Sequence, residues 1–553
     1  MKIDTEEYHR SLVISPFAFY ILFFAATIVY ITGLYVKVMD VDAAQYASIS
    51  REMLISQHYL QVLDHGKNYL DKPPLLFWLS ALSFKIFGIS AFSYKLPSFL
   101  FTLLGVYSTF RLAKHLYDKT TGLLAALIIY TSQAFFLFNN DVRTDTLLTA
   151  FVIFSCWQLV LFSDLKNIWN LLAGFAGVAM AMMAKGPLGA VIPVSALLVH
   201  YVLKCQWQNF FRWQWIAGVI LTLIILAPMV TGLYQQFGKE GPKFFFWTQS
   251  FGRITGENQW RNDAGYFYFT HVFLWSFLPW SILVAPAMLF SLVKIFKSRF
   301  AKDALTEYYS VGGFLLPFIA LSLSKYKLPH YIFVLYPLAA IFTAAFIMHI
   351  IPVSKAATRI LGIVQLIICA GMITMAIIIC TQWFPGAGFV LWLPVTVGAA
   401  AGFWLWLMPK NLISRIVLPS ALIAIVVNLL LNAHAYPALL KYQSGSELAA
   451  VAIKENVPED KIFALNYSNY SFDFYFGNAP QILNSRQALT YIKLEQDFWL
   501  IVSEEILELL DQQNIQVKRI FSAEDYHITT LTLEFLNQDT RQQTTKKVYL
   551  VKI

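Results

Sequence analysis

Long apolar segments constrain this chain more than any other feature of its sequence. Apolar runs of about 20 residues recur from Val13 to Leu431, and each is long enough to cross roughly 30 Å of hydrocarbon. Of the 553 residues, 58% are hydrophobic and only 13% are charged, whereas a soluble domain has about 25% charged residues. The aromatic content of 16% is typical of interfacial belts and of packing between spans. The sequence therefore predicts an all-α polytopic membrane protein.

The positions of the apolar runs predict about 13 transmembrane helices. They lie at residues 14–35, 95–114, 120–139, 145–163, 168–184, 187–204, 213–235, 268–294, 308–323, 328–350, 358–381, 387–408 and 413–434. The segment Pro73–Ser90 is ambiguous, because it is apolar but short and is interrupted by Lys85 and Gly88. It fits either a further span or a helix that lies at the membrane interface.

The distribution of basic residues distinguishes between these two possibilities. If Pro73–Ser90 does not cross and the N-terminus is cytoplasmic, nearly every cytoplasmic connection is basic, as the positive-inside rule requires. These connections are Arg111–Lys119, Lys166, Lys204–Arg212, Lys294–Lys302, Lys355–Arg359 and Lys410–Arg415. We therefore favour the interfacial helix, and we attribute the net charge of +9 to loops that set topology, not to nucleic-acid binding.

The same topology places the polar C-terminal part outside the membrane. The outer segments are then residues 36–94, 140–144, 185–186, 236–267, 324–327, 382–386 and everything after about residue 436. We expect a membrane domain over residues 1–436 and a soluble extracytoplasmic α/β domain over 437–553. Within that domain the pattern predicts a capped amphipathic helix at Ser444–Asn456, strands at Lys461–Leu465, Phe498–Val502 and Lys547–Ile553, and a helix at Glu504–Gln513.

The cysteines and the first apolar run have simple structural interpretations. Cys156, Cys205, Cys369 and Cys380 lie in or at the ends of apolar segments, so we predict packing residues and neither disulfides nor a metal site. The run Val13–Val36 is too long for a signal peptide and lacks a small-residue cleavage site, so we predict a retained span. The sequence shows no internal repeat.

The first outer loop is too long to be a simple connector. It contains DVDAAQYASISREML, in which Tyr46, Ile49, Met53 and Leu54 recur at helical spacing. We expect an amphipathic helix there, with Asp42 just before its start. Asp42 then has two interpretations, since Asp is a common N-cap residue and a carboxylate can also act as a general base.

Further ionisable residues lie where the predicted spans meet the outer face. In the motif DKPP, Asp71 and Lys72 lie just before the N-terminus of an apolar helix. The side chain of Lys72 has two interpretations, since it either reaches the lipid headgroups or binds an anion. Asp145 lies at the start of a predicted span in NDVRTDTLLTAF. Burial of a charged carboxylate there costs free energy unless the group is paired, so such a residue is either paired or functional. The basic candidates on this face are Arg51, Lys185, Arg253, Lys325 and Lys327.

Acids and bases from separate helices thus meet at one membrane face, against the positive-inside bias. An anionic ligand at the membrane surface explains the bases, because lysine and arginine clamp phosphate groups. Asp42 and Asp145 supply carboxylates for general base catalysis. Together these groups are the parts needed for attack on a phosphate-activated carbon that is embedded in lipid.

Six segments in order carry a resemblance to a known family. DAAQYASISREML is followed by DKPPLLFWLSALSFKIFG, YKLPSFLFTLLGVYSTFRLAKHLY, VRTDTLLTAF, AKGPLG and SKYKLPHYIFVLYPLAA. This series resembles the protein O-mannosyltransferase-like families of glycosyltransferase C fold, and within them most of all the bacterial aminoarabinose transferases that modify lipid A. The resemblance covers residues 14–350, whereas the later part matches only in general layout.

The resemblance implies roles for individual residues. Asp42 matches the family's catalytic acidic position, Asp145 matches the second acidic position, and Lys72 matches the lysine that binds the carrier-lipid phosphate. Asp71, Arg51, Lys185, Arg253, Lys325 and Lys327 complete the expected substrate-binding set. Departures occur at Ala43 and Gln45, where the family often has Glu and Arg, and at Asp71, where the aminoarabinose enzymes have Glu. These departures leave the sugar, and a possible divalent metal ion, open.

The resemblance also implies an activity. We expect an inverting glycosyltransferase of the bacterial inner membrane, with its active site on the periplasmic face. It would move a sugar from a polyprenyl-phosphate carrier to lipid A or another envelope glycan, with membrane lipids but no nucleic acid as partners. Three alternatives remain: a protein O-mannosyltransferase-like enzyme, a transporter or flippase of lipid-linked sugars, and an accessory scaffold. A transporter is less favoured, since the charges gather on one face and not at mid-membrane.

Overall fold

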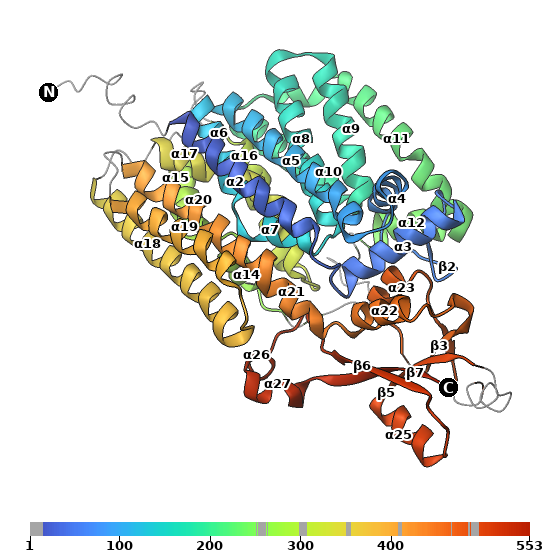
Figure 1. Cartoon of the computed structure of the whole chain (residues 1–553). Helices are drawn as coiled ribbons and strands as arrows, with labels where there is room; N and C mark the ends of the chain where they lie inside the picture. Colours follow the sequence, from blue (N-terminus) through green and yellow to red (C-terminus); the bar gives the residue numbers. More distant parts are fainter. Residues whose placement is uncertain are drawn as a thin grey trace.

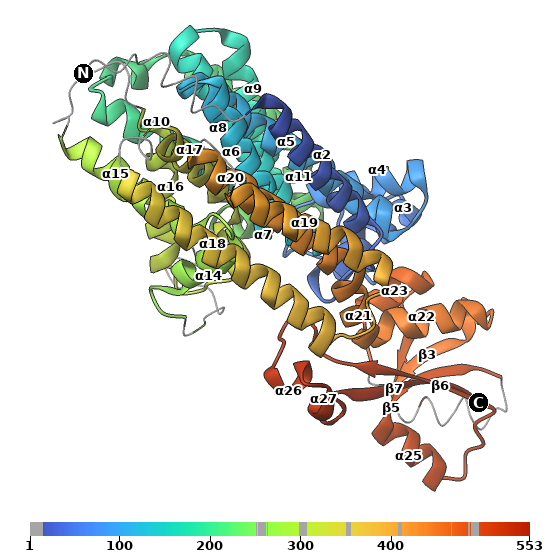
Figure 2. The same ribbon diagram turned by 60° about the vertical axis from the view of Figure 1, so that its left-hand side comes forward.

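The fold consists of a long helical bundle with a small α/β region at one end (Figures 1 and 2). The computed structural model describes residues 15–249, 252, 262, 264–297, 307–349, 355–407, 412–465, 467–484, 487 and 497–553. The C-terminal α/β region, here residues 444–553, contacts the bundle at the end where the loop elements α3 (Asp42–Ser56) and α4 (Leu75–Phe87) also lie (Figure 1).

Each predicted apolar run contains a helix. In chain order the helices are α2 (Pro16–Leu34), α5 (Ala91–Leu116), α6 (Lys119–Tyr130), α7 (Gln133–Asn140), α8 (Thr144–Leu165), α9 (Ile168–Lys185), α10 (Leu188–Leu203), α11 (Gln214–Phe237), α14 (Tyr268–Ser276), α15 (Ser281–Lys297), α16 (Tyr309–Leu323), α17 (Tyr336–His349), α18 (Lys355–Ile378), α19 (Phe389–Leu407) and α20 (Leu412–Leu430). Short helical turns connect them, among them η1 (Trp207–Phe211), α12 (Glu240–Lys243), η2 (Phe244–Thr248), η3 (Pro329–Leu335), η5 (Ile379–Trp383), η6 (Leu431–Ala435), α21 (Tyr436–Leu439) and η7 (Leu440–Tyr442).

The length of these helices supports a polytopic membrane protein. Within the described ranges, nine helical segments are long and apolar enough to cross a membrane, and α6 and α7, bent by 50°, would together make a tenth. Helices α10, α15 and α16 have 16, 17 and 15 residues and fall short of that length. The predicted helical membrane fold is confirmed, while the count of about 13 spans stays a prediction.

Helices inside the bundle differ from those at its surface. Helix α8 is buried over most of its length and is apolar on every side, as a helix surrounded by other helices must be. Helices α18 and α19 instead expose apolar side chains, such as Ile367 at 65% and Val390 at 85%. Exposure of this kind is unfavourable in water but neutral in hydrocarbon, so it indicates contact with lipid.

The segment that contains α4 does not lie along the bundle. Figure 1 views α4 nearly along its axis, whereas the long helices run across the picture. With 13 residues, α4 is about 20 Å long, which is too short to span the hydrocarbon. Both observations favour the interfacial helix that the charge pattern predicted for Pro73–Ser90.

The C-terminal region is built on a five-stranded sheet of order β4–β3–β5–β7–β6. The strands are β3 (Ile462–Leu465), β4 (Gln481–Leu483), β5 (Trp499–Ser503), β6 (Arg519–Asp525) and β7 (Lys546–Lys552). Strands β4, β3 and β5 are parallel, and β7 and β6 add antiparallel strands. The register places Ile462 beside Trp499, and Trp499 beside Lys552.

The predicted elements of this region are largely confirmed. The three predicted strands are β3, β5 and β7, and the two predicted helices are α22 (Ser444–Lys454) and α25 (Glu504–Gln512). The expected cap of the first helix is wrong, because its N-cap residue Gln443 makes no side-chain capping bond. The sequence missed β4 and β6 and the short helices α23 (Tyr470–Phe476), α26 (Leu533–Leu536) and α27 (Gln538–Thr544).

The cysteines match the prediction except at one position. All four are free thiols, and Cys156, Cys369 and Cys380 are buried among apolar side chains. Cys205 is exposed, so its assignment as a packing residue is wrong. It lies in a turn with φ 54°, two residues after the end of α10, and it is not part of the buried helix.

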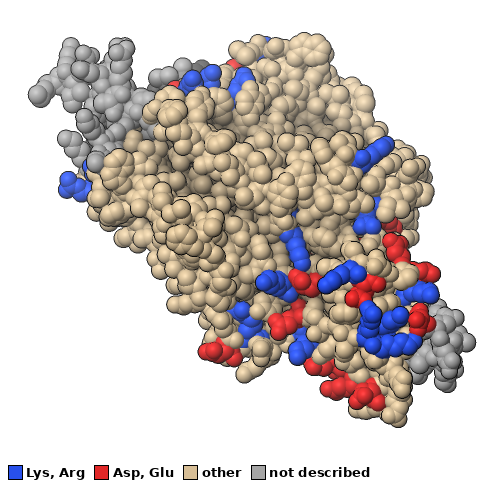
Figure 3. Space-filling model, in the orientation of Figure 1, with Lys and Arg blue, Asp and Glu red and all other residues tan. Residues whose placement is uncertain are grey.

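Charge is distributed unevenly over the molecule. Figure 3 shows Lys, Arg, Asp and Glu side chains gathered over the C-terminal region, while the visible face of the bundle is almost free of them. Of the predicted basic connections, Arg111–Lys119, Lys166 and Lys204–Arg212 lie at the end of the bundle opposite the C-terminal region (Figure 1). Residues 298–306, 350–354 and 408–411 of these connections, Lys302 and Lys410 among them, lie outside the described residues.

Cysteine labelling tests the topology. Lys67→Cys and Lys239→Cys, at exposed loop positions, should react with a membrane-impermeant maleimide added from outside. Lys297→Cys and the native Cys205, at the opposite end of the bundle, should react only after permeabilisation. Labelling of position 297 from outside would overturn both the number of crossings and the shared outer face.

Candidate functional site

Arg143 joins three separate parts of the chain at the end of the bundle that faces the C-terminal region. Its Nη1 donates to Asp42 Oδ2 at 2.6 Å, and its Nε donates to Asp141 Oδ2 at 2.9 Å. The same Nη1 lies 3.3 Å from His330 Nδ1. One guanidinium therefore ties the first residue of α3 to the α7–α8 junction and to η3.

The local backbone explains how these side chains meet. Asp141 ends α7 and Arg143 precedes the first residue of α8 in an extended conformation, so the chain turns sharply between two helices. Asp42 is the first residue of α3, with Val41 at the N-cap position and no side-chain capping bond. The capping interpretation of Asp42 is therefore wrong, because its carboxylate pairs with Arg143.

Burial distinguishes the two carboxylates on Arg143. The side chain of Asp141 is 15% exposed, whereas that of Asp42 is 40% exposed. Burial raises the pKa of Asp141 above its ordinary value, and the nearby Arg143 opposes that shift. Asp42 is thus the carboxylate that a molecule arriving from solvent can reach.

A buried lysine fixes the start of the loop that carries Asp42. Lys95 on α5 is fully buried, and its Nζ donates to Val36 O at 2.8 Å and to Gly33 O at 3.2 Å. These carbonyls lie at the C-terminal end of α2, where peptide groups lack helical partners. The ammonium group satisfies them and holds the chain just before Asp42.

A second ion pair lies beside the Arg143 cluster. Lys185 Nζ donates to Asp145 Oδ1 at 2.5 Å, and the two side chains are only 13% and 3% exposed. The same ammonium lies 4.8 Å from the centre of the Tyr331 ring. Gly186 ends α9 with φ 77°, a conformation that glycine adopts without strain, and so leaves Lys185 on the last turn.

Lys72 pairs with Asp71, a carboxylate that lies near Tyr46 of α3. Its Nζ contacts Asp71, and Gln249 donates to the Asp71 main-chain carbonyl and, at 3.2 Å, to Asp71 Oδ1. The pKa of Tyr46 is raised well above its ordinary value by burial, and the charges of Asp42 and Asp71 add to that effect. One hydroxyl on α3 is thus close to both acids.

The remaining predicted residues lie at different places. Lys327 is 4% exposed and its Nζ donates to Ala264 O at 2.7 Å, whereas Lys325 is exposed. Arg51 lies nine residues after Asp42 on α3, about 14 Å along the helix, and donates to Phe474 O of the C-terminal region. Arg253 lies outside the described residues.

The sequence left open whether the site holds a divalent metal ion. Among those residues, no three His, Cys, Asp or Glu side chains are placed to hold a metal ion together. The carboxylates of the site contact Arg143, Lys185 and Lys72 instead.

Two residues of the cluster were missed by the sequence analysis. Arg143 was not chosen, although it lies between Asp141 and Asp145 in DVRTDTLLTAF. A cation between two acids next to a predicted span was a usable signal. His330 directly follows the motif YKLP, but a single histidine beside an apolar run does not reveal its partner. Only the packing of η3 against α8 brings it to Arg143.

Comparisons of the sequence with known proteins agree with the expected resemblance. A model of the dolichyl-phosphate-mannose-protein mannosyltransferase family matches residues 71–231. The undecaprenyl phosphate-alpha-4-amino-4-deoxy-L-arabinose arabinosyl transferase of Edwardsiella ictaluri (strain 93-146) is 26% identical over 347 residues, which cover 62% of this chain and 61% of that protein. An uncharacterised protein of Aquifex aeolicus (strain VF5) is 34% identical over 274 residues, 49% of this chain and 59% of that protein. The chain thus matches less than two thirds of the length of these relatives.

A solved structure shares the fold. The crystal structure of ArnT from Cupriavidus metallidurans bound to undecaprenyl phosphate superposes with a TM-score of 0.75 over 96% of this chain and 97% of that chain, at 16% identity. The same protein in the apo state gives a TM-score of 0.72. The resemblance to aminoarabinose transferases and the predicted fold of glycosyltransferase C type are therefore confirmed.

The buried ion pair between Lys185 and Asp145 should contribute to the stability of the fold. Lys185→Met should lower the free energy of unfolding by about 3–5 kcal/mol, because Asp145 would be left buried without a counter-charge. Adding Asp145→Asn should restore most of the loss. Thermal unfolding of the purified protein measures both effects.

The control for this experiment is an exposed ion pair. Lys243 contacts Glu240, and the two side chains are 63% and 77% exposed. Lys243→Met should change stability by about 0–1 kcal/mol. Equal losses from Lys185→Met and Lys243→Met would contradict a structural role of the buried pair.

Proposed function

We propose that this chain is an inverting glycosyltransferase that uses a polyprenyl-phosphate-linked sugar as donor. The observation that carries the proposal is the solvent-accessible Asp42, held by Arg143 near Asp71 and Lys72 at one end of a membrane bundle. That arrangement puts a base and a phosphate-binding cation together where a lipid carrier would present its head group. The relative from Edwardsiella ictaluri supports it, since its name specifies undecaprenyl phosphate-alpha-4-amino-4-deoxy-L-arabinose.

Asp42 is the proposed general base. Arg143 binds one oxygen of its carboxylate and keeps the group in a fixed orientation, while the exposed side chain leaves room for an acceptor hydroxyl. The base removes the acceptor proton as the oxygen attacks the anomeric carbon. The carrier phosphate leaves from the opposite side, so a single displacement inverts the configuration and needs no covalent enzyme intermediate.

Asp145 has a different proposed role from the one expected at first. Its side chain is 3% exposed and its Oδ1 contacts Lys185, so it is poorly placed to accept a proton from an incoming acceptor. We assign it to positioning Lys185. The base role therefore falls to Asp42 alone.

Lys72 is the proposed ligand of the carrier phosphate. Its side chain is 16% exposed and immediately precedes Pro73 and Pro74, which begin the interfacial helix α4. A phosphate at this depth stays ionised, and the leaving group needs stabilisation of charge more than protonation. Lys185 and Lys327 are the further cations proposed for the donor or acceptor, and Lys325 and Arg253 are retained as candidates.

The remaining assignments follow from the same proposal. The donor would be an undecaprenyl phosphate-linked sugar, and the acceptor lipid A or another envelope glycan. We place the protein in the bacterial inner membrane, with the site and the domain from residue 437 onward on the periplasmic face. The domain boundary at 436 is likewise part of the proposal.

Turnover of a radiolabelled polyprenyl-phosphate sugar tests the activity. Purified protein in nanodiscs should transfer the label to lipid A and release the polyprenyl phosphate. A flippase would instead move the labelled lipid across a proteoliposome membrane without cleaving it. Intact donor after prolonged incubation with each acceptor class would overturn the proposed function.

Substitution of Asp42 tests the base. Asp42→Asn should lower turnover about 10²–10⁴-fold, because an amide cannot accept the acceptor proton. Donor affinity should persist or increase, since a negative charge near the phosphate has been removed. Transfer rate and donor affinity are measured on protein whose thermal stability equals that of the wild type. Near-normal turnover would move the base role to another residue.

Substitution of Lys72 tests the phosphate site. Lys72→Ala should weaken donor binding about ten- to a hundredfold, the loss expected for one charge-assisted hydrogen bond of about 1.5–3 kcal/mol. Lys85→Ala is the matched control, because Lys85 is exposed near the other end of the same helix α4. Titration with the carrier phosphate measures both variants. Equal affinities of the two variants would make Lys72 a membrane anchor.

A further inference from the structure

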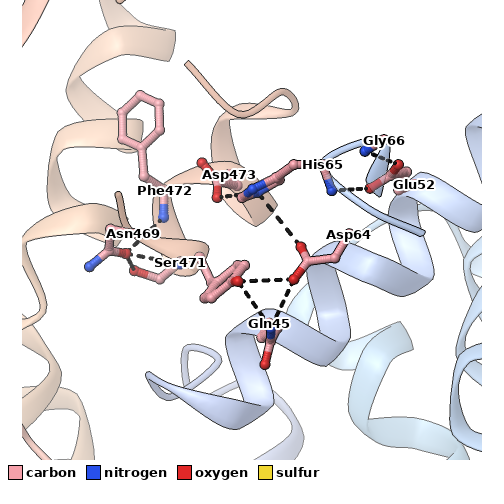
Figure 4. Close-up of polar contacts among 10 residues, drawn as sticks. Gln45, Glu52, Asp64, His65, Gly66, Asn469, Ser471, Phe472 and Asp473 are labelled. Atoms are coloured by element: carbon pink, nitrogen blue, oxygen red, sulfur yellow. Dashed lines mark hydrogen bonds and ion pairs between the residues drawn. The ribbon is translucent and has the colours of Figure 1, made fainter. Parts of the chain in front are cut away.

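A short hairpin of the first outer loop projects toward the C-terminal region. Strands β1 (Leu63–Asp64) and β2 (Lys67–Asn68) pair through a two-residue turn, His65–Gly66, with φ of 54° and 71°. This turn geometry favours Asn or Gly, and a left-handed conformation costs other residues about 1–2 kcal/mol. The carboxylate of Glu52 on α3 accepts hydrogen bonds from the main-chain amides of His65, at 2.9 Å, and Gly66, at 2.8 Å (Figure 4). The tip of the hairpin is thereby held to α3.

The side chain of His65 reaches across to the C-terminal region. Its Nε2 lies 3.0 Å from Asp473 Oδ2 and 3.9 Å from Asp64 Oδ1 (Figure 4). The ring also stacks on Tyr470, with the centroids 5.4 Å apart. Asp473 is 4% exposed and His65 is 32% exposed, so the contact is shielded on one side and open to solvent protons on the other.

The contact continues into the helix that carries Asp42. Asp64 Oδ2 accepts hydrogen bonds from Gln45 Nε2 and from the Tyr470 hydroxyl, both at 2.9 Å. Gln45 is three residues after Asp42, about one turn along α3 and on a neighbouring face. A chain of polar contacts therefore runs from Asp473 through His65, Asp64 and Gln45 to the turn that holds Asp42.

Other contacts fix α23 against both ends of α3. Arg51, in the second half of α3, donates to Phe474 O at 2.9 Å, and the Val38 amide before α3 donates to the Tyr475 hydroxyl at 2.8 Å. Asp40 accepts hydrogen bonds from Ser471 and Asn469. These contacts join α3 and the segment before it to α23, so we expect a change at this interface to shift the start of α3.

We propose that His65 and Asp473 are positioning residues, which couple the C-terminal region to α3 and set the placement of Asp42 according to whether His65 carries a proton. The role of Asp42 rests on the proposed function. The coupling itself rests on the contacts above. His65 and Asp473 act through Gln45 and α3, without touching the substrate.

The charges around His65 fix the direction of this dependence. The carboxylates of Asp473, Asp64 and Glu52 face it from α23, β1 and α3. The Tyr470 ring stacks on it, and Tyr467 lines the same small cavity. Hydrogen bonding to Asp473 raises the pKa of His65 above its ordinary 6.5, although burial opposes the shift. A raised pKa means that the contact is fully formed below 6.5 and is lost as the pH rises through the higher value.

Asp40 is a second titrating group at the interface between α3 and α23. The variant Asp40→Asn separates its effect from that of His65. Burial raises the pKa of Asp40 to about 7, from an ordinary value of 3.8. Its effect has the same sign, because an acid whose pKa is raised by folding destabilises the fold as it ionises. The stability that protonated Asp40 contributes is lost by about pH 7. The stability that protonated His65 contributes is lost over a range that extends above pH 6.5.

Hydrogen exchange of the α3 amides in the full-length protein measures the coupling without using activity. In the wild type, protection of residues 42–56, corrected for intrinsic exchange, should fall about tenfold as the pH rises above the pKa of His65. His65→Gln should remove this step. Asp473→Asn should move it to lower pH, because the amide still accepts a hydrogen bond but no longer adds charge. His58→Gln, at an exposed position of the same loop, should retain the wild-type step.

Two outcomes would overturn the proposal. One is a step that persists unchanged in His65→Gln and in Asp473→Asn. The other is a step that disappears in Asp40→Asn while it remains in His65→Gln, which would assign the coupling to Asp40. Asp473→Asn decides the question even if His65→Gln fails to fold.

The pH profile of sugar transfer connects the coupling with Asp42. Turnover should decline over the same pH range as the protection of α3, and His65→Gln should abolish that decline. A purely structural role of His65 would lower turnover equally at every pH and would contradict the proposal. If the wild type transfers no sugar, the proposed function fails, while the exchange experiment still decides the coupling between α3 and α23.

Discussion

The polar end of this protein is organised around the guanidinium of Arg143. An arginine side chain presents several donors in a rigid plane, so one group can hold Asp42, Asp141 and the ring of His330 at the same time. A lysine offers no such fixed geometry. Without Arg143, the buried Asp141 would lack a counter-ion for its negative charge. The carboxylate of Asp42 would then also have no fixed orientation. The contact thus joins the start of α3, the α7–α8 junction and η3 into one site.

The rest of the bundle makes this concentration of charge possible. Most of the side chains around these charges are buried and apolar, and the low dielectric of such surroundings strengthens each charge contact. Lys95 and the Lys185–Asp145 pair follow the same rule, since each buried charge meets a carbonyl or an opposite charge. The C-terminal region then covers this end through α23, which joins the same loop helix that carries Asp42.

Particular elements show where sequence patterns succeed. Strands β3 and β5 were predicted because they are buried and read as continuous apolar runs, whereas the edge strand β6 (RIFSAED) was missed because it is largely open to solvent. The assignment of Cys205 as a packing residue was wrong, since apolar neighbours in sequence do not ensure neighbours in space. The capping role of Asp42 was wrong for a related reason, because the partner of its carboxylate lies 101 residues away.

The amino-acid sequence alone is enough to predict a helical membrane protein. Its motifs also place Asp42, Asp71, Lys72, Asp145 and Lys185 near the ends of predicted helices. These features depend on segment length, apolar periodicity and the local distribution of charge, all of which are local properties of the chain. The pairing of Asp42 with Arg143, the pairing of Asp145 with Lys185 and the contact of Arg51 with the C-terminal region are visible only in the folded protein. Such pairings depend on how helices distant in sequence pack together, and the spacing of residues along one chain does not encode them directly.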